Sequence, residues 1–225
     1  MLLVSLSPRL EAVLAAAGRC AVLADLCADH ALIALAAVAR GRAGLAIAVE
    51  LRRLPLQAAL QNRELSKVEE GRVLLVRGRG LAPVRRAEVI VVAGVGGDLA
   101  AQLLGAEPAC ASATRVVVQP NRHSREVRAW ALGAGFRLVA ESAVAEGEKL
   151  HLVLSFERHP GPDPAYGARP REAELDLGPL LLRSAEPADR LFLRRELQRL
   201  RRLTEMRPDL LPARAVLEEL FGSAS

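Results

Sequence analysis

The sequence predicts an α/β fold in which a mainly parallel sheet is covered by helices on both faces and followed by a small helical region. Apolar runs of strand length alternate with stretches of helical spacing along residues 21–134. Such alternation is typical of right-handed crossovers between parallel strands. Two further apolar runs then follow one another with no helix between them, which predicts an antiparallel hairpin at the edge of the sheet.

A leading helix is expected over residues 8–17, because Ser7-Pro8 has the pattern of an N-cap followed by proline in the first turn. Apolar residues recur at helical spacing until Gly18. Strands are expected at residues 21–26, 44–49, 72–76, 88–93 and 115–119, and helices at about 31–40, 54–65, 97–104 and 124–134. The edge hairpin is expected at about 136–142 and 150–156.

The composition changes after Phe156, where the proline-rich run from His159 to Pro164 is typical of a linker. Two helices are predicted beyond it, at 189–203 and at about 212–221, and the first carries leucines on one side and arginines around the rest. We therefore expect two domains, at residues 1–157 and 158–225.

The composition excludes several classes of protein. Of the 225 residues, 51% are hydrophobic and 25% charged, a globular balance, and with 3% aromatic residues there is little material for stacking nucleic-acid bases. The net charge of +5 permits a polyanionic partner without requiring one. The scattered Cys20, Cys27 and Cys110 form neither a zinc motif nor a disulfide framework. With no apolar run long enough to span a bilayer, we expect a cytoplasmic protein that uses neither a metal nor a membrane.

Acidic residues end the first two predicted strands, where an open parallel sheet binds its ligands. Asp25 and Asp29 end the first strand and open the next helix. They form either a nucleoside site or a simple strand-to-helix turn in which Asp29 is the N-cap. Glu50 ends the second strand, either to accept both hydroxyls of a ribose or as a solvated acid. Its occurrence together with Asp25 and Asp29 favours the nucleoside site.

Glycine-rich turns end the third and fourth strands. Gly78-Arg79-Gly80 is a tight turn at the place where an adenine ring would lie. In Ala93-Gly94-Val95-Gly96-Gly97, three glycines leave the backbone bare, so that a flat substrate is able to approach. Since this turn follows the fourth strand, it is not expected to be a dinucleotide phosphate loop.

Polar and basic residues follow the fifth strand. Arg122, Arg125 and Arg128 are spaced three apart, which predicts either a stripe that contacts phosphates or a solvated helix face. His30, His123 and Trp130 are equally compatible with packing roles.

Taken in order, these segments resemble one family, the bacterial tRNA (adenine-22-N1)-methyltransferases, which use S-adenosylmethionine. The resemblance runs from Ser7 to about Phe156. It rests on Leu6-Ser7-Pro8-Arg9-Leu10, Ala24-Asp25 with Asp29-His30-Ala31, Ala46-Ile47-Ala48 with Glu50, Gly80-Leu81, Ala93-Gly94 with Gly96-Gly97, and Gln119-Pro120-Asn121 with Arg128 and Trp130.

The resemblance implies a Rossmann-like class I methyltransferase domain followed by a helical, coiled-coil-like domain. The residues it implies for the cofactor pocket are Asp25, Cys27, Asp29, Glu50, Arg79, Gly80, Ala93 and Gly94. Asp29 would orient the target base, and Asn121 would provide a second polar contact. The substrate would be bound by Gly96, Gly97, Arg122, Arg125, Arg128, Arg194, Arg195 and Arg199. The expected partner is tRNA, bound by a monomer.

Four residues depart from the family pattern. Cys27 and Val49 stand where glycine is common, Leu32 where tyrosine is common, and Arg79 where an aspartate normally meets the adenine. These departures leave open two alternatives to adenine N1 methylation: a catalytically silent member that binds RNA or a protein, and a methyltransferase with a different target. The retained acidic residues and the glycine-rich turn favour an enzyme.

Overall fold

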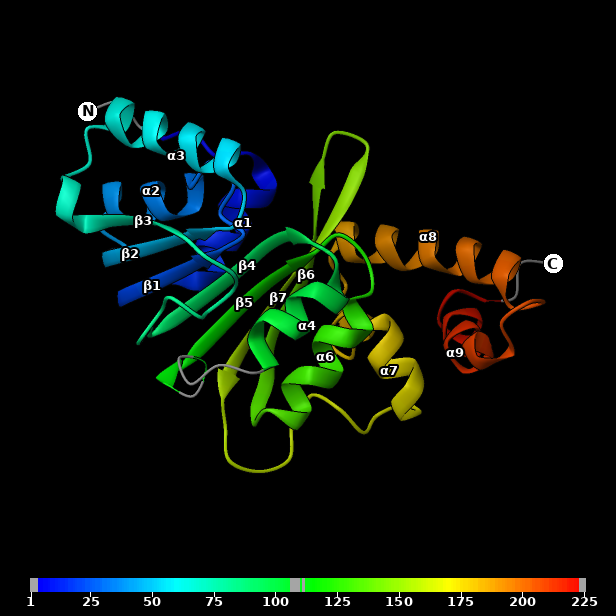
Figure 1. Ribbon diagram of the computed structural model, residues 1–225. Helices are drawn as coiled ribbons and strands as arrows, with labels where there is room; N and C mark the ends of the chain where they lie inside the picture. Colours follow the sequence, from blue (N-terminus) through cyan, green and yellow to red (C-terminus); the bar gives the residue numbers. More distant parts are fainter. Residues whose placement is uncertain (1–3, 106–109, 111, 223–225) are drawn as a thin grey trace.

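The chain folds around one seven-stranded mixed sheet (Figure 1), described by a computed structural model for residues 4–105, 110 and 112–222. The strand order is β3-β2-β1-β4-β5-β7-β6. The strands are β1 (Cys20–Leu26), β2 (Ala43–Glu50), β3 (Val73–Arg77), β4 (Val89–Val95), β5 (Arg115–Pro120), β6 (Phe136–Glu146) and β7 (Lys149–Arg158). The first five strands are parallel to one another, and β7 pairs antiparallel with both β5 and β6. The predicted parallel sheet with an antiparallel edge hairpin is confirmed.

Helices cover both faces of the sheet, as expected for strands joined by crossovers (Figure 1). One face carries α1 (Pro8–Ala17), α2 (Leu32–Ala39) and α3 (Arg53–Ser66), and the other carries α4 (Gly97–Gly105) and α6 (Ser124–Gly133). A short 3-10 turn, η1 (Glu70–Arg72), precedes β3. The two faces bury separate apolar clusters, one around Leu14, Leu35 and Val91 and the other around Ile90 and Phe156.

The C-terminal region packs against the edge hairpin. It contains α7 (Arg171–Leu177), η2 (Leu181–Arg183), α8 (Pro187–Leu203), η3 (Pro208–Leu210) and α9 (Leu211–Phe221). Leu193, Leu197 and Leu217 belong to the same apolar cluster as Phe156 of β7. The buried Asp189 near the start of α8 accepts a hydrogen bond of 2.5 Å from the backbone N–H of Ala143 in β6. These contacts fix the first turns of α8 to the sheet, while its far end extends away from it (Figure 1).

The sequence did not predict α7. This helix has seven residues and follows the proline-rich linker, so its sequence carries too few turns to show a helical period. The described part of the chain contains no helix that combines the length and the apolar character needed to cross a membrane.

Candidate active site

Two adjoining cavities lie where β1, β2, β3 and β4 end, at the carboxyl edge of the sheet. The first, of about 300 Å³, is lined by charged residues such as Arg9, Asp25 and Asp29 together with apolar ones such as Leu10 and Leu32, and we call it the polar cavity. The second, of about 270 Å³, is lined mainly by apolar residues such as Val49, Leu99 and Leu103. Both cavities are lined by Cys27, Arg52 and Val95, which therefore form the boundary between them.

All eight residues expected to form the cofactor pocket line one of these cavities. Asp25, Asp29, Ala93 and Gly94 line the polar cavity; Glu50, Arg79 and Gly80 line the apolar one; Cys27 lines both. Parallel register brings the strand ends together, because Asp25 of β1 pairs with Ala48 of β2 and with Val91 of β4.

Asp25 is a buried carboxylate with little hydrogen bonding. It is 2% exposed, and within the described residues its carboxylate accepts one hydrogen bond, a long one of 3.3 Å from the Ala34 N–H. Burial raises the pKa of Asp25 to about 7, although the Ala34 bond acts in the opposite direction. A cationic group bound in the cavity would stabilise the ionised form of this carboxylate.

The loop from Cys27 to Ala31 has an unusual backbone. Cys27, Asp29 and Ala31 adopt φ angles of +53°, +49° and +56°, in the left-handed region that non-glycine residues seldom occupy. A glycine would adopt the backbone conformation of Cys27 without strain. Burial, with the nearby Glu50 and Asp25 carboxylates, raises the pKa of the Cys27 thiol to about 11, so the thiol stays protonated at neutral pH.

Glu50 connects the end of β2 to this loop. Its side chain is 5% exposed, its Oε2 accepts the Asp29 N–H at 3.2 Å, and its Oε1 accepts the Arg52 N–H at 2.8 Å. The Arg52 guanidinium also approaches Glu50 Oε1 (3.3 Å) and Asp29 Oδ1 (3.7 Å). Asp29, Glu50 and Arg52 are thus joined in one network.

The bend at Gly94, where β4 shifts register against β5, is fixed by side chains at the end of β5 and just beyond it. Gly94 adopts φ +79°, its N–H donates to Gln119 Oε1 (3.1 Å), and its carbonyl oxygen accepts from Asn121 Nδ2 (2.7 Å). Gln119 is fully buried and also donates to Asn121 Oδ1 at 3.2 Å. Asn121, expected to contact the target base, lines neither cavity; the structure gives it the task of holding Gly94.

Gly96 and Gly97, expected to bind substrate, do not line the cavities either. A Cβ atom on Gly97 would lie 1.9 Å from the His123 carbonyl oxygen, so glycine is required there by the close approach of two backbones. The side chains of His123 and Asp98 pair beside this contact, which joins the start of α4 to the turn before α6.

The expected stripe of Arg122, Arg125 and Arg128 does not form. Arg122 precedes α6 and is exposed, whereas Arg125 pairs with Glu172 and with Asp176 at 3.0 Å. Arg128 is fully buried, paired with Glu141, and donates to the carbonyl oxygen of Leu175 at 2.7 Å. The expectation that Arg128 contacts phosphates is therefore wrong, because its guanidinium has no access to solvent and anchors α7 to α6.

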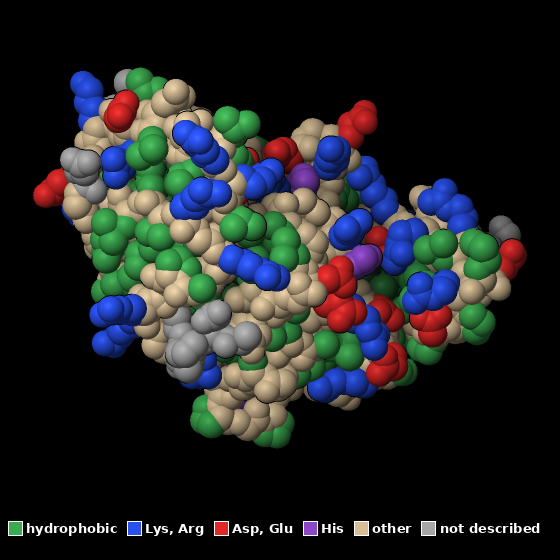
Figure 2. Space-filling model, in the orientation of Figure 1, with side chains coloured by type: hydrophobic (Ala, Val, Ile, Leu, Met, Phe, Trp, Pro, Cys, Tyr) green, Lys and Arg blue, Asp and Glu red, His purple; other side chains and the backbone are tan. Residues whose placement is uncertain are grey.

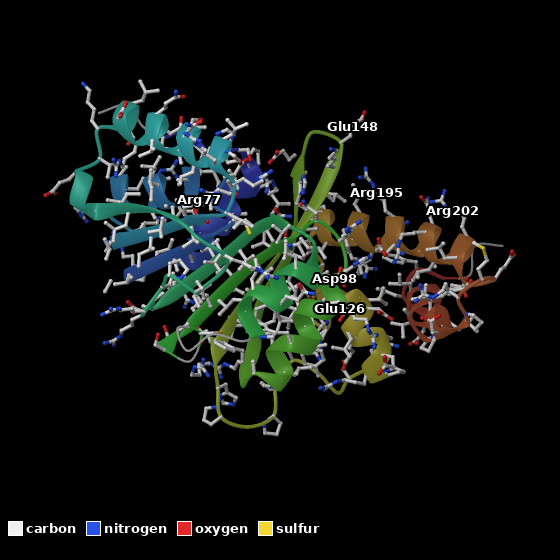
Figure 3. The ribbon with its side chains drawn as sticks, viewed as in Figure 1. Arg77, Asp98, Glu126, Glu148, Arg195 and Arg202 are labelled. Atoms are coloured by element: carbon white, nitrogen blue, oxygen red, sulfur yellow. The ribbon has the colours of Figure 1, made fainter. Side chains whose placement is uncertain are left out.

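The expected arginines of α8 are exposed. Arg195 donates to the carbonyl oxygen of Glu148 at 2.8 Å, at the tip of the β6–β7 hairpin (Figure 3). The Arg194 guanidinium lies over the Phe221 ring, 4.8 Å from its centroid, and Arg199 pairs with Glu196 at 2.8 Å. Figure 2 shows basic side chains along α8 interspersed with acidic ones.

Sequence reasoning assigned no role to Arg9 and Arg52, which line the polar cavity beside the expected acids. The position of Arg52, two residues after Glu50, was a signal for its place in the site. Arg9 lies in α1, far from Glu50 in the sequence, and only the fold brings it to the cavity. Among the described residues, no group of three or more histidine, cysteine or acidic side chains is placed to hold a metal ion.

The chain is similar to known methyltransferases in sequence. A family model described as a methyltransferase domain matches residues 6–154. The tRNA (adenine(22)-N(1))-methyltransferase of Bacillus subtilis strain 168 is 31% identical over 198 residues, which cover 87% of this chain and 81% of that protein.

Solved structures show the same likeness. The B. subtilis M1A22 tRNA methyltransferase TrmK superposes with a TM-score of 0.83 at 27% identity, covering 96% of this chain and 99% of that one. Streptococcus pneumoniae Sp1610, in complex with S-adenosyl-L-methionine, gives a TM-score of 0.84 at 29% identity with the same coverage.

The fold and the cavities at its carboxyl edge define a class I methyltransferase domain. The chain belongs to the tRNA (adenine(22)-N(1))-methyltransferase family.

Proposed function

We propose that the protein transfers a methyl group from S-adenosylmethionine to N1 of adenine 22 in tRNA. The observation that carries this proposal is the convergence of all eight expected cofactor residues on two adjoining cavities. The activity named for the B. subtilis relative supports tRNA as the substrate.

The residues of the two cavities fit this cofactor. The apolar cavity between Val49, Leu99 and Leu103 suits the adenine ring, and the Glu50 carboxylate at its edge suits two ribose hydroxyls. The polar cavity, with the buried Asp25, suits the cationic amino group at the other end. Arg79 fits less well, because a guanidinium is unable to accept the amino protons of adenine. When bound, S-adenosylmethionine supplies an electrophilic methyl group on a sulfonium sulfur.

The protein's own task is placement, because adenine N1 already carries a lone pair able to attack the methyl carbon. Asp29 borders the polar cavity with a half-exposed carboxylate, where it orients the adenine amino group and balances the positive charge of the methylated ring. Gln119 and Asn121 fix the Gly94 backbone against which the ring lies. The exposed arginines of α8, Arg194, Arg195 and Arg199, hold phosphates of the tRNA.

We also infer that the protein works as a cytoplasmic monomer and without a metal ion. Its cysteines Cys20, Cys27 and Cys110 are free thiols, which suits a reducing compartment. Sedimentation with and without tRNA tests the monomer, and activity in excess chelator tests the independence from metal.

Calorimetry and labelled-methyl transfer together test the main proposal. The wild-type protein is expected to bind S-adenosylmethionine and to transfer its methyl group to an unmodified tRNA transcript. Glu50→Ala is expected to weaken cofactor binding, whereas Glu157→Ala, at a surface pair with Arg115, serves as the control. A wild-type protein that binds tRNA but not S-adenosylmethionine would instead be a silent member, the alternative that Cys27 and Arg79 favour.

A further inference from the structure

Arg9 is a positively charged residue that lines the polar cavity, where it lies near the buried carboxylate of Asp25. It lies in the first turn of α1 and lines the polar cavity together with Asp25 and Gly94. Its Nη1 is 3.6 Å from the point that a Cβ atom on Gly94 would occupy. Arg9 therefore lies directly against the bare backbone of the β4 bend.

The fold holds this guanidinium on two sides. Arg9 Nη1 donates to the buried Gln119 Oε1 at 2.6 Å, and the Arg9 backbone N–H donates to Glu146 Oε2 at 3.1 Å. Arg9 Nε lies 3.9 Å from the same Glu146 oxygen. Because Gln119 is itself fixed by Gly94 and Asn121, the position of the Arg9 side chain is set before any ligand binds.

These contacts leave part of the guanidinium free. Arginine has five N–H donors, and among the described residues Nη2 of Arg9 has no hydrogen-bond partner. The side chain is 22% exposed and lines the polar cavity. A preorganised guanidinium edge is the usual partner of a carboxylate or a phosphate, which it binds through charge-assisted hydrogen bonds.

We propose that Arg9 binds the α-carboxylate of S-adenosylmethionine, an assignment that rests on the proposed function. Asp25 and Arg9 then present opposite charges to the two charged groups of an amino-acid end within one cavity of about 300 Å³. A tRNA phosphate beside the target adenine would offer the same oxyanion chemistry, so the test distinguishes these two sources.

The test compares S-adenosylmethionine with its decarboxylated analogue by calorimetry on the full-length protein. The wild-type protein is expected to bind the parent compound roughly 10-fold or more tightly than the analogue, as one charge-assisted interaction provides. Arg9→Ala is expected to remove that preference by weakening only the parent compound, and Arg9→Lys to restore part of it.

A structural role for Arg9 would give a different pattern. If Arg9→Ala weakens both compounds equally, the residue merely supports Gln119 and the proposal is wrong. If it leaves both affinities unchanged but weakens tRNA binding, the oxyanion is a phosphate and the proposal is also wrong. The control is Arg40→Ala, which removes an arginine paired with Glu11 at 2.7 Å, outside both cavities; it is expected to change neither affinity.

The failure of this inference is distinct from the failure of the proposed function. A wild-type protein that binds neither compound would overturn both. Tight binding of S-adenosylmethionine that is insensitive to Arg9→Ala would overturn the role of Arg9 alone.

Discussion

Arg128 of α6 and Glu141 of β6 form an ion pair in which both side chains are fully buried, with Arg128 Nε 2.7 Å from Glu141 Oε1. Arg128 also donates to Ser124 Oγ at 3.1 Å and to the carbonyl oxygen of Leu175 at 2.7 Å. Burial raises the pKa of Glu141 above its ordinary value, and the opposite effect of the adjacent Arg128 is smaller. The pair joins the sheet edge, α6 and α7.

Removing one partner of this pair leaves an uncompensated buried charge. We expect Arg128→Met to lower the free energy of unfolding by roughly 3–5 kcal/mol, measured by urea denaturation. The control Arg199→Met breaks an exposed pair with Glu196 and is expected to cost less than about 1 kcal/mol. Equal costs for the two variants would contradict the structural role of Arg128.

The buried Asp25 makes stability depend on pH. Its pKa is about 7 in the folded protein against an ordinary value of 3.8, so the unfolded chain releases this proton first as the pH rises. Asp25 therefore lowers the free energy of unfolding by up to roughly 1.4 kcal/mol per pH unit between about 4 and 7. We expect the free energy of unfolding of Asp25→Asn, relative to that of the wild type, to be higher at pH 7.5 than at pH 5, as measured by denaturation at both pH values. Identical pH profiles would contradict this.

Gly97 has no room for a side chain. A Cβ atom there would meet the His123 carbonyl oxygen at 1.9 Å, whereas one on Gly133 at the end of α6 would meet nothing within 4 Å. Gly97→Ala is expected to lower the melting temperature strongly, and Gly133→Ala to leave it unchanged or raise it slightly. A tolerated Gly97→Ala would show that the two backbones are farther apart.

Asp29 is expected to act on turnover more than on cofactor binding. Asn suits the left-handed backbone at this position (φ +49°) and keeps the N–H that bonds to Glu50. We expect Asp29→Asn to reduce kcat roughly 10- to 100-fold through poorer placement of the base, with little change in the calorimetric affinity for S-adenosylmethionine. Unchanged turnover would remove Asp29 from the mechanism.

The arginines of α8 are expected to govern affinity for tRNA. Replacing Arg194, Arg195 and Arg199 together by Ser is expected to weaken binding and to reduce the slope of log K against log salt by about 2–3. The matched control replaces Arg19, Arg85 and Arg86, exposed residues that precede β1 and β4 at the amino ends of these parallel strands. Equal effects of the two triple variants would indicate a response to net charge alone.

Much of the fold followed from local pattern. Each predicted strand occurs within a few residues of its expected bounds, because buried parallel strands such as β4 are nearly continuous apolar runs. The convergence of Asp25, Glu50 and Gly94 on two adjoining cavities was predictable for a related reason, because the carboxyl ends of parallel strands meet at one edge of the sheet.

Long-range partners were not predictable. The spacing of Arg128 indicated a surface stripe, and nothing near it in the sequence revealed that Glu141 would bury it. Asn121 has a polar side chain of the kind that often contacts a substrate, yet its amide donates a hydrogen bond to the Gly94 carbonyl oxygen. Arg9 is held at the cavity by Gln119 and Glu146, which lie more than one hundred residues away in the sequence.

Mapping the methylated nucleotide is the most direct test of methyl transfer to adenine 22. Unmodified tRNA is incubated with the purified protein and S-adenosylmethionine, and the product is analysed by nuclease digestion with mass spectrometry. N1-methyladenine is expected at position 22, and no methylation is expected of a transcript with guanine there. Absence of methyl transfer, or a methyl group on another nucleotide, would contradict this expectation.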